Sequence, residues 1–262
     1  MKSNINKDTQ FIAFATQKGG VGKSVFSVLM ASMLHYKMGY NVVIVDCDFP
    51  QYSIHQMRDR DIAVMEQEEK YKKMYDTQQQ TLQKPPYTIL CSPAENAIDI
   101  VNSFLASCQT RVDMVIFDLP GTIKSKGVLQ CIACLDYMFT PIISDRIVLE
   151  SSLSFAITVK QMLIENPQYT IKEIHLFWNM VDERERTELY DVYTESIVDL
   201  GLHILHTTLP DTKRFKKELR TDGKAAFRST IFPPNPRMLR GSRFDLLVEE
   251  IIQITKLKPN EQ

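Results

Sequence analysis

The stretch that decides the fold is Gln17-Lys18-Gly19-Gly20-Val21-Gly22-Lys23-Ser24, which follows the apolar run Phe11–Ala15 and opens a helical pattern over Ser24–Met38. Its glycines let backbone N–H groups approach phosphate oxygens, and the start of the following helix adds positive potential. In such a loop Lys23 reaches the β- and γ-phosphates and the Ser24 hydroxyl ligates Mg²⁺. The string therefore predicts a phosphate-binding loop between a strand and a helix.

Short apolar runs alternate with longer helical patterns along the rest of the chain. The predicted strands are Phe11–Ala15, Val42–Val45, Tyr87–Leu90, Met114–Phe117, Tyr137–Thr140, Ile174–Trp178 and the weaker Leu202–Leu205. The predicted helices are Ser24–Met38, Ala94–Ser107, Val148–Glu165, Thr187–Leu200 and Phe244–Ile254. Because the strands are continuously apolar, helices are expected on both faces of a doubly wound, mostly parallel α/β sheet.

The pattern predicts a single domain over residues 1–262 with one departure, a charged, Gln-rich insertion at about residues 59–84. Such a segment is typical of a solvated helix or a mobile insertion. A partner-binding surface or a lid beside the nucleotide is the functional alternative.

The composition is that of a soluble globular protein, with 262 residues, a formal net charge of -1, 44% hydrophobic and 24% charged residues. These values exclude a disordered chain, a collagen-like repeat and a coiled-coil rod. No apolar run approaches the ~20 residues that span a bilayer, and the polar N-terminus lacks a signal-peptide stretch. We therefore expect a cytoplasmic protein. Its cysteines are expected to be reduced, and the pair Cys131 and Cys134 favours core packing over a metal or redox site because its surroundings are apolar and helical.

Carboxylates stand at the ends of two predicted strands. Asp46 and Asp48 follow the second strand, and Asp118 follows the fourth and precedes Gly121. The carboxyl ends of parallel strands meet at the edge where the phosphate loop lies. Asp118 is therefore predicted to hold Mg²⁺ through water, and Gly121 to move with the γ-phosphate. Asp46 and Asp48 are expected to orient water or metal, with capping of the strand end as the alternative.

The phosphate loop resembles that of the deviant Walker A family of ParA, MinD and nitrogenase iron protein. Gln17 stands where the usual first glycine falls, and a second lysine, Lys18, follows it. The resemblance implies ATP and Mg²⁺ as cofactors and an ATP-sandwich homodimer in which Lys18 contacts the partner's phosphates. It also implies that Asp48 positions the attacking water and that Asp46 supports the loop and the metal shell, although an extra residue, Phe49, interrupts the family's usual continuation.

The residue roles implied by this resemblance fall into four groups. The catalytic residues are Lys18, Lys23 and Asp48, and the metal residues are Ser24, Asp46 and Asp118. The phosphate contacts are Lys18, Gly19, Gly20, Val21, Gly22, Lys23, Ser24 and Val25, the last through its backbone alone. Asn179, after the sixth strand, resembles the family residue that bonds the adenine edge, and Pro210, in Leu209-Pro210-Asp211-Thr212, resembles the turn on the other side of the base.

A basic stretch lies between Asp211 and Arg243, where ten cations and three acids give 10 - 3 = +7, so the remainder of the chain carries -1 - 7 = -8. The residues that we expect to contact DNA are Lys213, Arg214, Lys216, Lys217, Arg220, Arg237, Arg240 and Arg243. Their cluster suits a phosphate backbone without base reading. Part of it, around Lys213 to Lys224, has helical spacing, and a solvated basic face is the alternative.

The resemblance as a whole implies a ParA-like ATPase that binds DNA nonspecifically and acts in partition or positioning of plasmid or mobile-element DNA at the nucleoid. A ParB-like or other stimulating protein is the implied partner, with no membrane contact. Three alternatives stay open: a MinD-like positioning ATPase, which the acidic last helix disfavours, an iron–sulfur relative using Cys131 and Cys134, and an ATP-switched regulator with little turnover.

Overall fold

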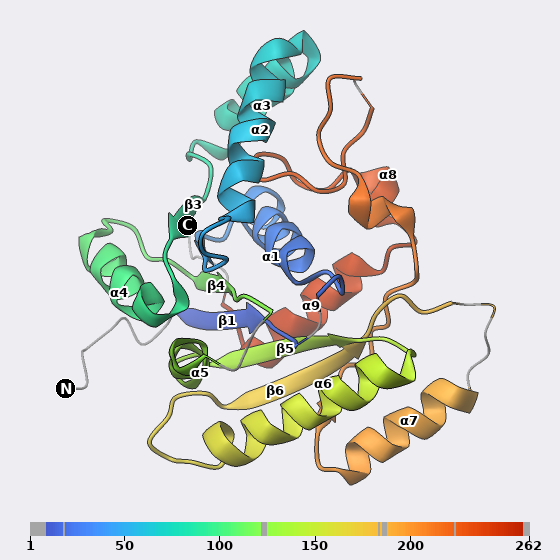
Figure 1. Ribbon diagram of the computed structural model, residues 1–262. Coiled ribbons are helices and arrows are strands. Elements are labelled where there is room, and N and C mark those ends of the chain that lie inside the picture. Colours follow the sequence, from blue (N-terminus) through green and yellow to red (C-terminus); the bar gives the residue numbers. More distant parts are fainter. Residues whose placement is uncertain are drawn as a thin grey trace.

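The computed structural model describes residues 9–17, 19–121, 125–182, 184, 188–222 and 224–258. These residues form a seven-stranded sheet in the order β3-β2-β4-β1-β5-β6-β7 (Figure 1), and every strand pair in it is parallel. The strands are β1 (Gln10–Phe14), β2 (Val42–Asp46), β3 (Thr88–Cys91), β4 (Met114–Asp118), β5 (Tyr137–Ile142), β6 (Glu173–Trp178) and β7 (His203–Ile204). The predicted doubly wound α/β sheet is therefore confirmed.

The strand order places the phosphate loop at the centre of the molecule. β1, which leads into the loop, lies between β4 and β5. Asp46 and Asp118 are direct neighbours in register at the carboxyl ends of β2 and β4. From β1 the chain builds the sheet first toward β2 and β3 and then, on the other side, toward β5, β6 and β7. In α/β proteins such a reversal leaves a crevice at the carboxyl edge of the sheet, where ligands bind.

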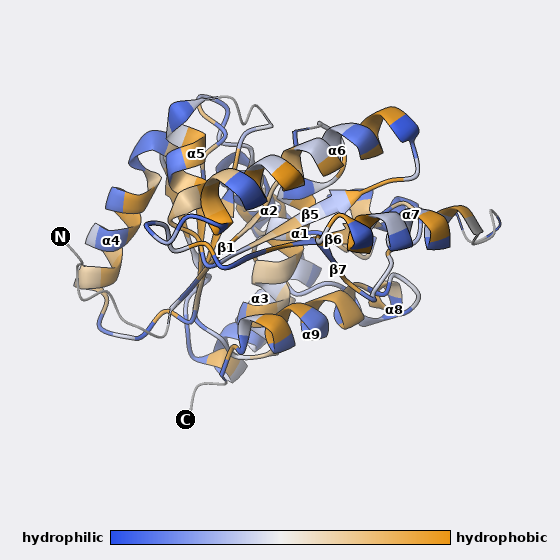
Figure 2. Ribbon diagram, turned by 90° about the horizontal axis from the view of Figure 1, so that it is seen from below, coloured by the Kyte–Doolittle hydropathy of each residue, from blue (hydrophilic) through white to orange (hydrophobic). Residues whose placement is uncertain are grey.

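Helices cover both faces of the sheet. On one face lie α4 (Ala97–Ser107), α5 (Lys126–Ala133), α6 (Arg146–Val159) and α7 (Glu188–Asp199). On the other lie α1 (Lys23–Ser32) and α9 (Phe244–Thr255), and Figure 2 shows α6 and α7 opposite α9. The last helix buries Phe244, Leu247, Val248 and Ile251 in the core, so it docks on the sheet.

Short helical turns complete the description. They are η1 (Met33–Lys37), which extends α1, η2 (Ala94–Asn96), η3 (Lys160–Ile164), which extends α6, η4 (Lys213–Lys216) and α8 (Pro236–Leu239). The stretch Arg146–Ile164 is long and apolar enough to cross a membrane. Its residues Leu149, Phe155 and Val159 are buried against the sheet.

The charged insertion is a pair of helices, α2 (Ser53–Gln67) and α3 (Glu69–Leu82), which pack against each other and extend beyond the sheet in Figure 1. The chain turns at Glu68, whose backbone is extended. α2 buries Ile54, Met57 and Asp61, whereas α3 buries only Tyr71 among its described side chains. The pair is thus a largely solvated hairpin with a narrow buried edge.

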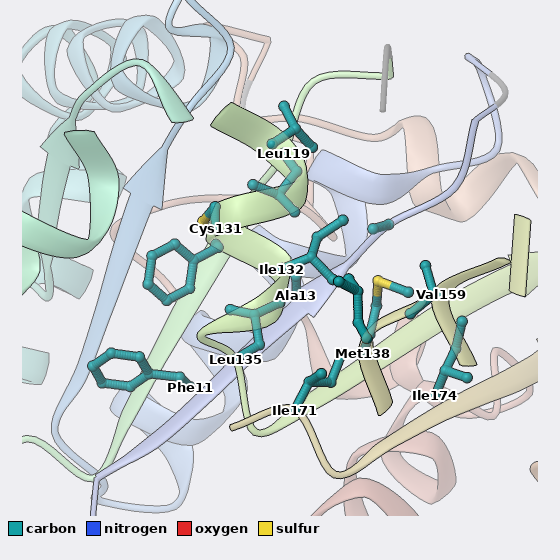
Figure 3. Close-up of a cluster of buried hydrophobic side chains, with 14 of the residues drawn as sticks. Phe11, Ala13, Leu119, Cys131, Ile132, Leu135, Met138, Val159, Ile171 and Ile174 are labelled. Carbon is teal, nitrogen blue, oxygen red and sulfur yellow. The ribbon is translucent and has the colours of Figure 1, made fainter. Parts of the chain in front are cut away.

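The two closely spaced cysteines have different surroundings. Cys131 is 1% exposed and lies in the apolar cluster of α5 and the sheet (Figure 3), where burial raises the pKa of its thiol to about 12. Cys134 is exposed, so the expected core packing is wrong for this second residue because α5 ends before it. Among the described residues no group of three or more His, Cys, Asp or Glu side chains could hold a metal ion.

Candidate functional site

The loop after β1 has the backbone of an anion site. Gly22 caps α1 with a φ of 95°, a left-handed conformation that L side chains rarely adopt, and an added Cβ there would lie 3.1 Å from the Phe26 ring. Lys23 is the first residue of α1, so the amide groups of the helix start face the loop. In the part of the chain that the structure describes, no atom lies within 4 Å of a Cβ added at Gly19 or Gly20. This geometry leaves room for phosphate groups over a helix N-terminus.

The Lys23 side chain lies between two of the predicted carboxylates. Burial lowers the pKa of its amino group, while the charges of Asp118 and Asp48 oppose that shift. Its Nζ would be 3.5 Å from a Cβ added to Gly121. The structure therefore places Lys23 beside Gly121 and within electrostatic range of Asp48 and Asp118 at the carboxyl edge of the sheet.

Asp118 is the buried acid of this site. Its carboxyl accepts hydrogen bonds from Ser24 and from Ser27, whose Oγ lies 3.2 Å from Oδ1. Burial raises the pKa of Asp118 to about 7, and the nearby charge of Asp46 adds to the rise, while the two serines and Lys23 oppose it. Ser24 and Asp118, both predicted metal residues, are thus in direct contact. Ser27 was not predicted, and its place one turn after Lys23 is the only signal that pointed to it.

Asp46 occupies a different position from the other predicted metal residues. Its Oδ2 accepts hydrogen bonds from the backbone N–H groups of Ile54 (2.9 Å) and His55 (3.1 Å), and its Oδ1 accepts one from Asp48 (3.3 Å). Burial raises the pKa of its carboxyl, and these three bonds oppose the rise. In the structure Asp46 therefore secures the first turn of α2 to the end of β2, which is a capping role.

A cavity of about 270 Å³ adjoins the loop on the side of β6. It is lined by the predicted base residues Asn179 and Pro210 together with Gly20, Gly22, Val25, Phe26 and others. The buried Asn179 donates from Nδ2 to the Val21 carbonyl (3.0 Å), so its side chain also supports the phosphate loop. Val181 pairs with Pro210 in an isolated bridge, which fixes the two walls.

Phe215 and Lys216 also line this cavity, although no local sequence pattern indicates that they would. Phe215 makes edge contacts with the rings of Phe26 and Phe244. The basic stretch therefore begins at the wall of the cavity rather than on a separate surface.

The expected helical face over Lys213 to Lys224 is wrong. Among the described residues of this range only η4 is helical, and the chain leaves it in an extended conformation at Lys217, whose carbonyl accepts the N–H groups of Phe227 and Arg228. Leu219 is buried instead of lying on a solvated helix. The basic residues are consequently presented from the short turns η4 and α8 and from the loops between them.

Most of the predicted DNA-contact residues are exposed. These are Lys213, Lys216, Lys217, Arg220, Arg237, Arg240 and Arg243. Arg214 is half-buried, and its Nη1 donates to the carbonyls of Met238 and Arg240. Arg228 pairs with Glu218. Arg214 and Arg228 thus hold loops together in this structure.

The described site has the kinds of side chain that bind a nucleoside triphosphate with Mg²⁺: a lysine, a hydroxyl and a carboxyl group. Magnesium usually keeps several waters and takes one or two carboxylates plus substrate phosphates, so no protein cage is needed. Ser24 and Asp118 supply a hydroxyl and a carboxyl beside Lys23. Lys18 lies outside the described residues, and its predicted role stays a prediction.

Comparisons with known proteins agree with this geometry. The model of the CobQ/CobB/MinD/ParA nucleotide binding domain matches residues 12–223. No curated protein sequence matches the chain. The solved structures that resemble this chain share few identical residues with it, so the resemblance to them is one of fold.

Three solved structures illustrate the similarity. A plasmid partition protein from Borrelia burgdorferi B31 bound to AMPPNP is 16% identical, with a TM-score of 0.58 over 93% of this chain and 98% of that chain. A ParA family ATPase from Chlorobium tepidum TLS is 16% identical, with a TM-score of 0.56 over 95% and 98%. MinD in the MinC:MinD complex of Aquifex aeolicus is 13% identical, with a TM-score of 0.56 over 97% and 98%.

Proposed function

This chain belongs to the family of CobQ/CobB/MinD/ParA nucleotide binding domains, and from that premise we propose that it is a ParA-like ATPase. In this proposal it binds ATP with Mg²⁺, forms a sandwich homodimer, and binds DNA nonspecifically in that state. It acts in partition or positioning of plasmid or mobile-element DNA, in the cytoplasm at the nucleoid. Hydrolysis is slow until a ParB-like or other protein partner stimulates it.

One observation carries the nucleotide part of the proposal. Lys23, Ser24 and Asp118 meet at the sheet edge, and the cavity lined by Asn179 and Pro210 opens beside them. A triphosphate on the loop would place its base in that cavity. Ligands of doubly wound sheets bind at such a crevice.

Each residue has a proposed task in hydrolysis. Lys23 neutralises charge on the β- and γ-phosphates, and Ser24 and Asp118 would hold Mg²⁺, which stabilises the charge that develops during phosphoryl transfer. Asp48, whose charge acts on Lys23, orients the attacking water. Lys18 is proposed to reach the nucleotide of the partner subunit in the dimer.

The DNA part of the proposal rests on charge. The exposed cations between Lys213 and Arg243 lie on η4, on α8 and in the connecting loops, and Lys216 among them lines the nucleotide cavity. Phosphate contacts from such residues need no base reading. Their proximity to the nucleotide supports a grip on DNA that depends on the bound nucleotide.

A gel shift with random-sequence DNA tests the DNA proposal directly. A shift is expected with ATP and not with ADP or without nucleotide, and the double variant Lys216→Glu/Arg220→Glu is expected to abolish it. The matched control is Lys37→Glu/Lys72→Glu, which reverses two exposed lysines that do not line the nucleotide cavity. The absence of an ATP-dependent shift in the wild type would remove the DNA-binding proposal.

The hydrolysis proposal is tested with Asp48→Ala. Loss of a water-positioning carboxylate is expected to reduce turnover on the order of 10²–10⁴-fold, with ATP affinity retained. Phosphate release and ATP binding are measured on the same preparations. Equal and slow turnover in wild type and variant would instead identify an ATP-switched regulator.

A further inference from the structure

A second concave site lies away from the nucleotide, between α3 and the loop that precedes α8. It is a groove of about 530 Å³. Its walls include Tyr71, Met74 and Gln78 from α3 and Leu219, Phe232 and Pro233 from the facing loops. This volume is within the range of ~300–1,000 Å³ that ligand sites usually have.

The walls of this groove are fixed by hydrogen bonds between segments far apart in the sequence. Tyr71 Oη donates to the Lys224 carbonyl (2.7 Å), and Gln78 Nε2 donates to the Ile231 carbonyl (2.8 Å). Asp61 on α2 accepts three more bonds, from the Ser229 hydroxyl and from the N–H and hydroxyl of Thr230. The groove is therefore preformed, so a ligand would not have to order it.

The floor of the groove is apolar and partly open to solvent. Tyr71, Leu219, Ile231 and Phe232 form a separate buried cluster below it. Met74 is 46% exposed at its edge. Flexible methionine side chains are common on surfaces that accept peptide side chains. A DNA backbone gains nothing from such a floor, because phosphates bind cations and hydrogen-bond donors.

Positive charge surrounds the apolar floor. Lys70 and Lys73 line the groove from α3. A second cavity of about 210 Å³ continues from it through Ala225, which lines both. The cations of that cavity are Lys216, Lys217, Arg220 and Lys224.

The acids at this surface leave an excess of positive charge. The second cavity contains Glu218, which pairs with Arg228, and Asp222, which pairs with Lys224 at 3.1 Å. Lys73 lies 3.8 Å from Glu69, and both side chains are 75% exposed, so solvent screens that pair. An acidic ligand is electrostatically complementary to Lys73 in the groove and to the cations Lys216, Lys217 and Arg220 in the adjoining cavity.

We propose that this groove docks an acidic segment of a partner protein, whose large apolar side chains fill the floor between α3 and Phe232 and whose carboxylates face Lys73 and the adjoining cations. Recognition of an apolar stripe in a groove with charges at the rim is a common mode of peptide binding. The assignment of the occupant as the stimulating partner rests on the proposed function, whereas the binding of the segment does not.

The test is selection of a random peptide library displayed on phage against the full chain, with counter-selection against the Met74→Asp variant. The enriched peptides are expected to be net acidic and to carry several large apolar residues. One of them is then synthesised with a fluorescent label, and its Kd is measured by anisotropy. Met74→Asp is expected to raise the Kd on the order of tenfold or more, because it places a carboxylate at the apolar floor.

Lys73→Glu and Lys72→Glu form a matched pair, since these neighbours on α3 are both exposed and only Lys73 lines the groove. Lys73→Glu is expected to raise the Kd about fivefold and Lys72→Glu less than about twofold. Met74→Leu, which keeps a large apolar side chain at this position, is expected to bind the peptide with the wild-type Kd. The proposal would be overturned if the enriched peptides were basic, or if no peptide were enriched on the wild type over Met74→Asp. Equal effects of Lys73→Glu and Lys72→Glu on the Kd would also overturn it.

The same variants separate this proposal from the proposed function. Met74→Asp is expected to retain ATP binding and the ATP-dependent DNA shift, because Met74 lines neither the nucleotide cavity nor the basic cavity. Loss of the DNA shift in this variant would show the groove to be part of a DNA interface and would overturn the peptide assignment. Failure of the DNA shift in the wild type would instead affect the proposed function alone.

Discussion

Asp118 combines full burial with a place opposite Lys23, and its protonation should therefore influence the folded state. Its pKa rises from 3.8 to about 7 on folding because burial disfavours the carboxylate. The folded state binds this proton more tightly than the unfolded state does, so its contribution is present at pH below about 4 and is lost as pH rises through about 7.

The first prediction concerns Asp118→Asn in metal-free, EDTA-treated buffer. Wild type is expected to lose up to about 4 kcal/mol of stability from this group between pH 4 and pH 8, and Asp118→Asn is expected to lack that part of the decline. Urea unfolding at several pH values measures it. Asp76→Asn, at an exposed position on α3, is the control, and a pH dependence that is the same in all three proteins would refute the raised pKa.

Asn179 carries the second residue-scale prediction. Because its amide supports Val21 and lines the cavity, Asn179→Ala is expected to weaken ATP binding by about 1–2 kcal/mol and to lower the preference for ATP over GTP. Binding of both nucleotides is measured by calorimetry. An equal loss for ATP and GTP would assign Asn179 to support of the phosphate loop alone.

The residues of the site differ in how far sequence could locate them. Lys23 and Ser24 are fixed by local spacing in the phosphate loop, and Asp118 by its place after an apolar strand. The capping of α2 by Asp46 could not be predicted, because it depends on the entry angle of a helix that begins seven residues later. Phe215 joins the cavity from far along the chain, and no local pattern indicates that.

At the scale of elements, α2 is held to the C-terminal loops by one buried acid. Asp61 is 3% exposed and accepts bonds from the Ser229 hydroxyl (3.1 Å), the Thr230 N–H (2.6 Å) and the Thr230 hydroxyl (2.8 Å). Arg58, one turn earlier, donates to the carbonyls of Tyr87 and Thr230 (3.0 Å each). The hairpin is therefore anchored by polar contacts more than by apolar burial.

The third prediction follows from this anchor. Asp61→Ala leaves a buried N–H without its acceptor and is expected to destabilise the protein by about 2–4 kcal/mol. Denaturant unfolding measures the change. The control is Asp59→Ala, on the same helix with a side chain that is 66% exposed, for which a change below about 0.5 kcal/mol is expected. Equal effects at both positions would contradict an anchoring role for Asp61.

Continuous apolar runs located each strand to within one or two residues, because strands buried on both faces leave that pattern. The helical hairpin was harder to predict from the sequence, because α2 and α3 bury few residues and therefore show only a weak apolar stripe. The helix predicted from the spacing of Lys213 to Lys224 does not form, because Leu219 is buried and the Lys217 carbonyl accepts hydrogen bonds from Phe227 and Arg228. Tertiary contacts there override the local pattern.

At the scale of the whole molecule, charge is divided between a basic stretch of +7 and a remainder of -8. Near-neutrality of the chain therefore conceals a polarised surface. Such a surface holds a polyanion locally, while the acidic remainder limits adhesion elsewhere.

The fourth prediction is the salt dependence of DNA binding in the ATP state. If about five cations contact phosphates, the affinity is expected to fall on the order of 10²–10³-fold between 50 and 200 mM salt. Fluorescence anisotropy with labelled duplex DNA measures the slope. Lys216→Ala/Arg220→Ala, which removes two cations without adding acids, is expected to reduce the slope by about two, and an unchanged slope would mean that these residues make no phosphate contacts.

The hydrogen bonds that Asp46 accepts at the start of α2 connect the end of β2 to the helical hairpin. One end of α2 is held by Asp46 at the sheet edge where the phosphate loop lies, and its later turn is held by Asp61 to the loops that build the distant groove. By thermodynamic reciprocity, any factor by which nucleotide alters the grip on the acidic segment equals the factor by which that segment alters the grip on nucleotide.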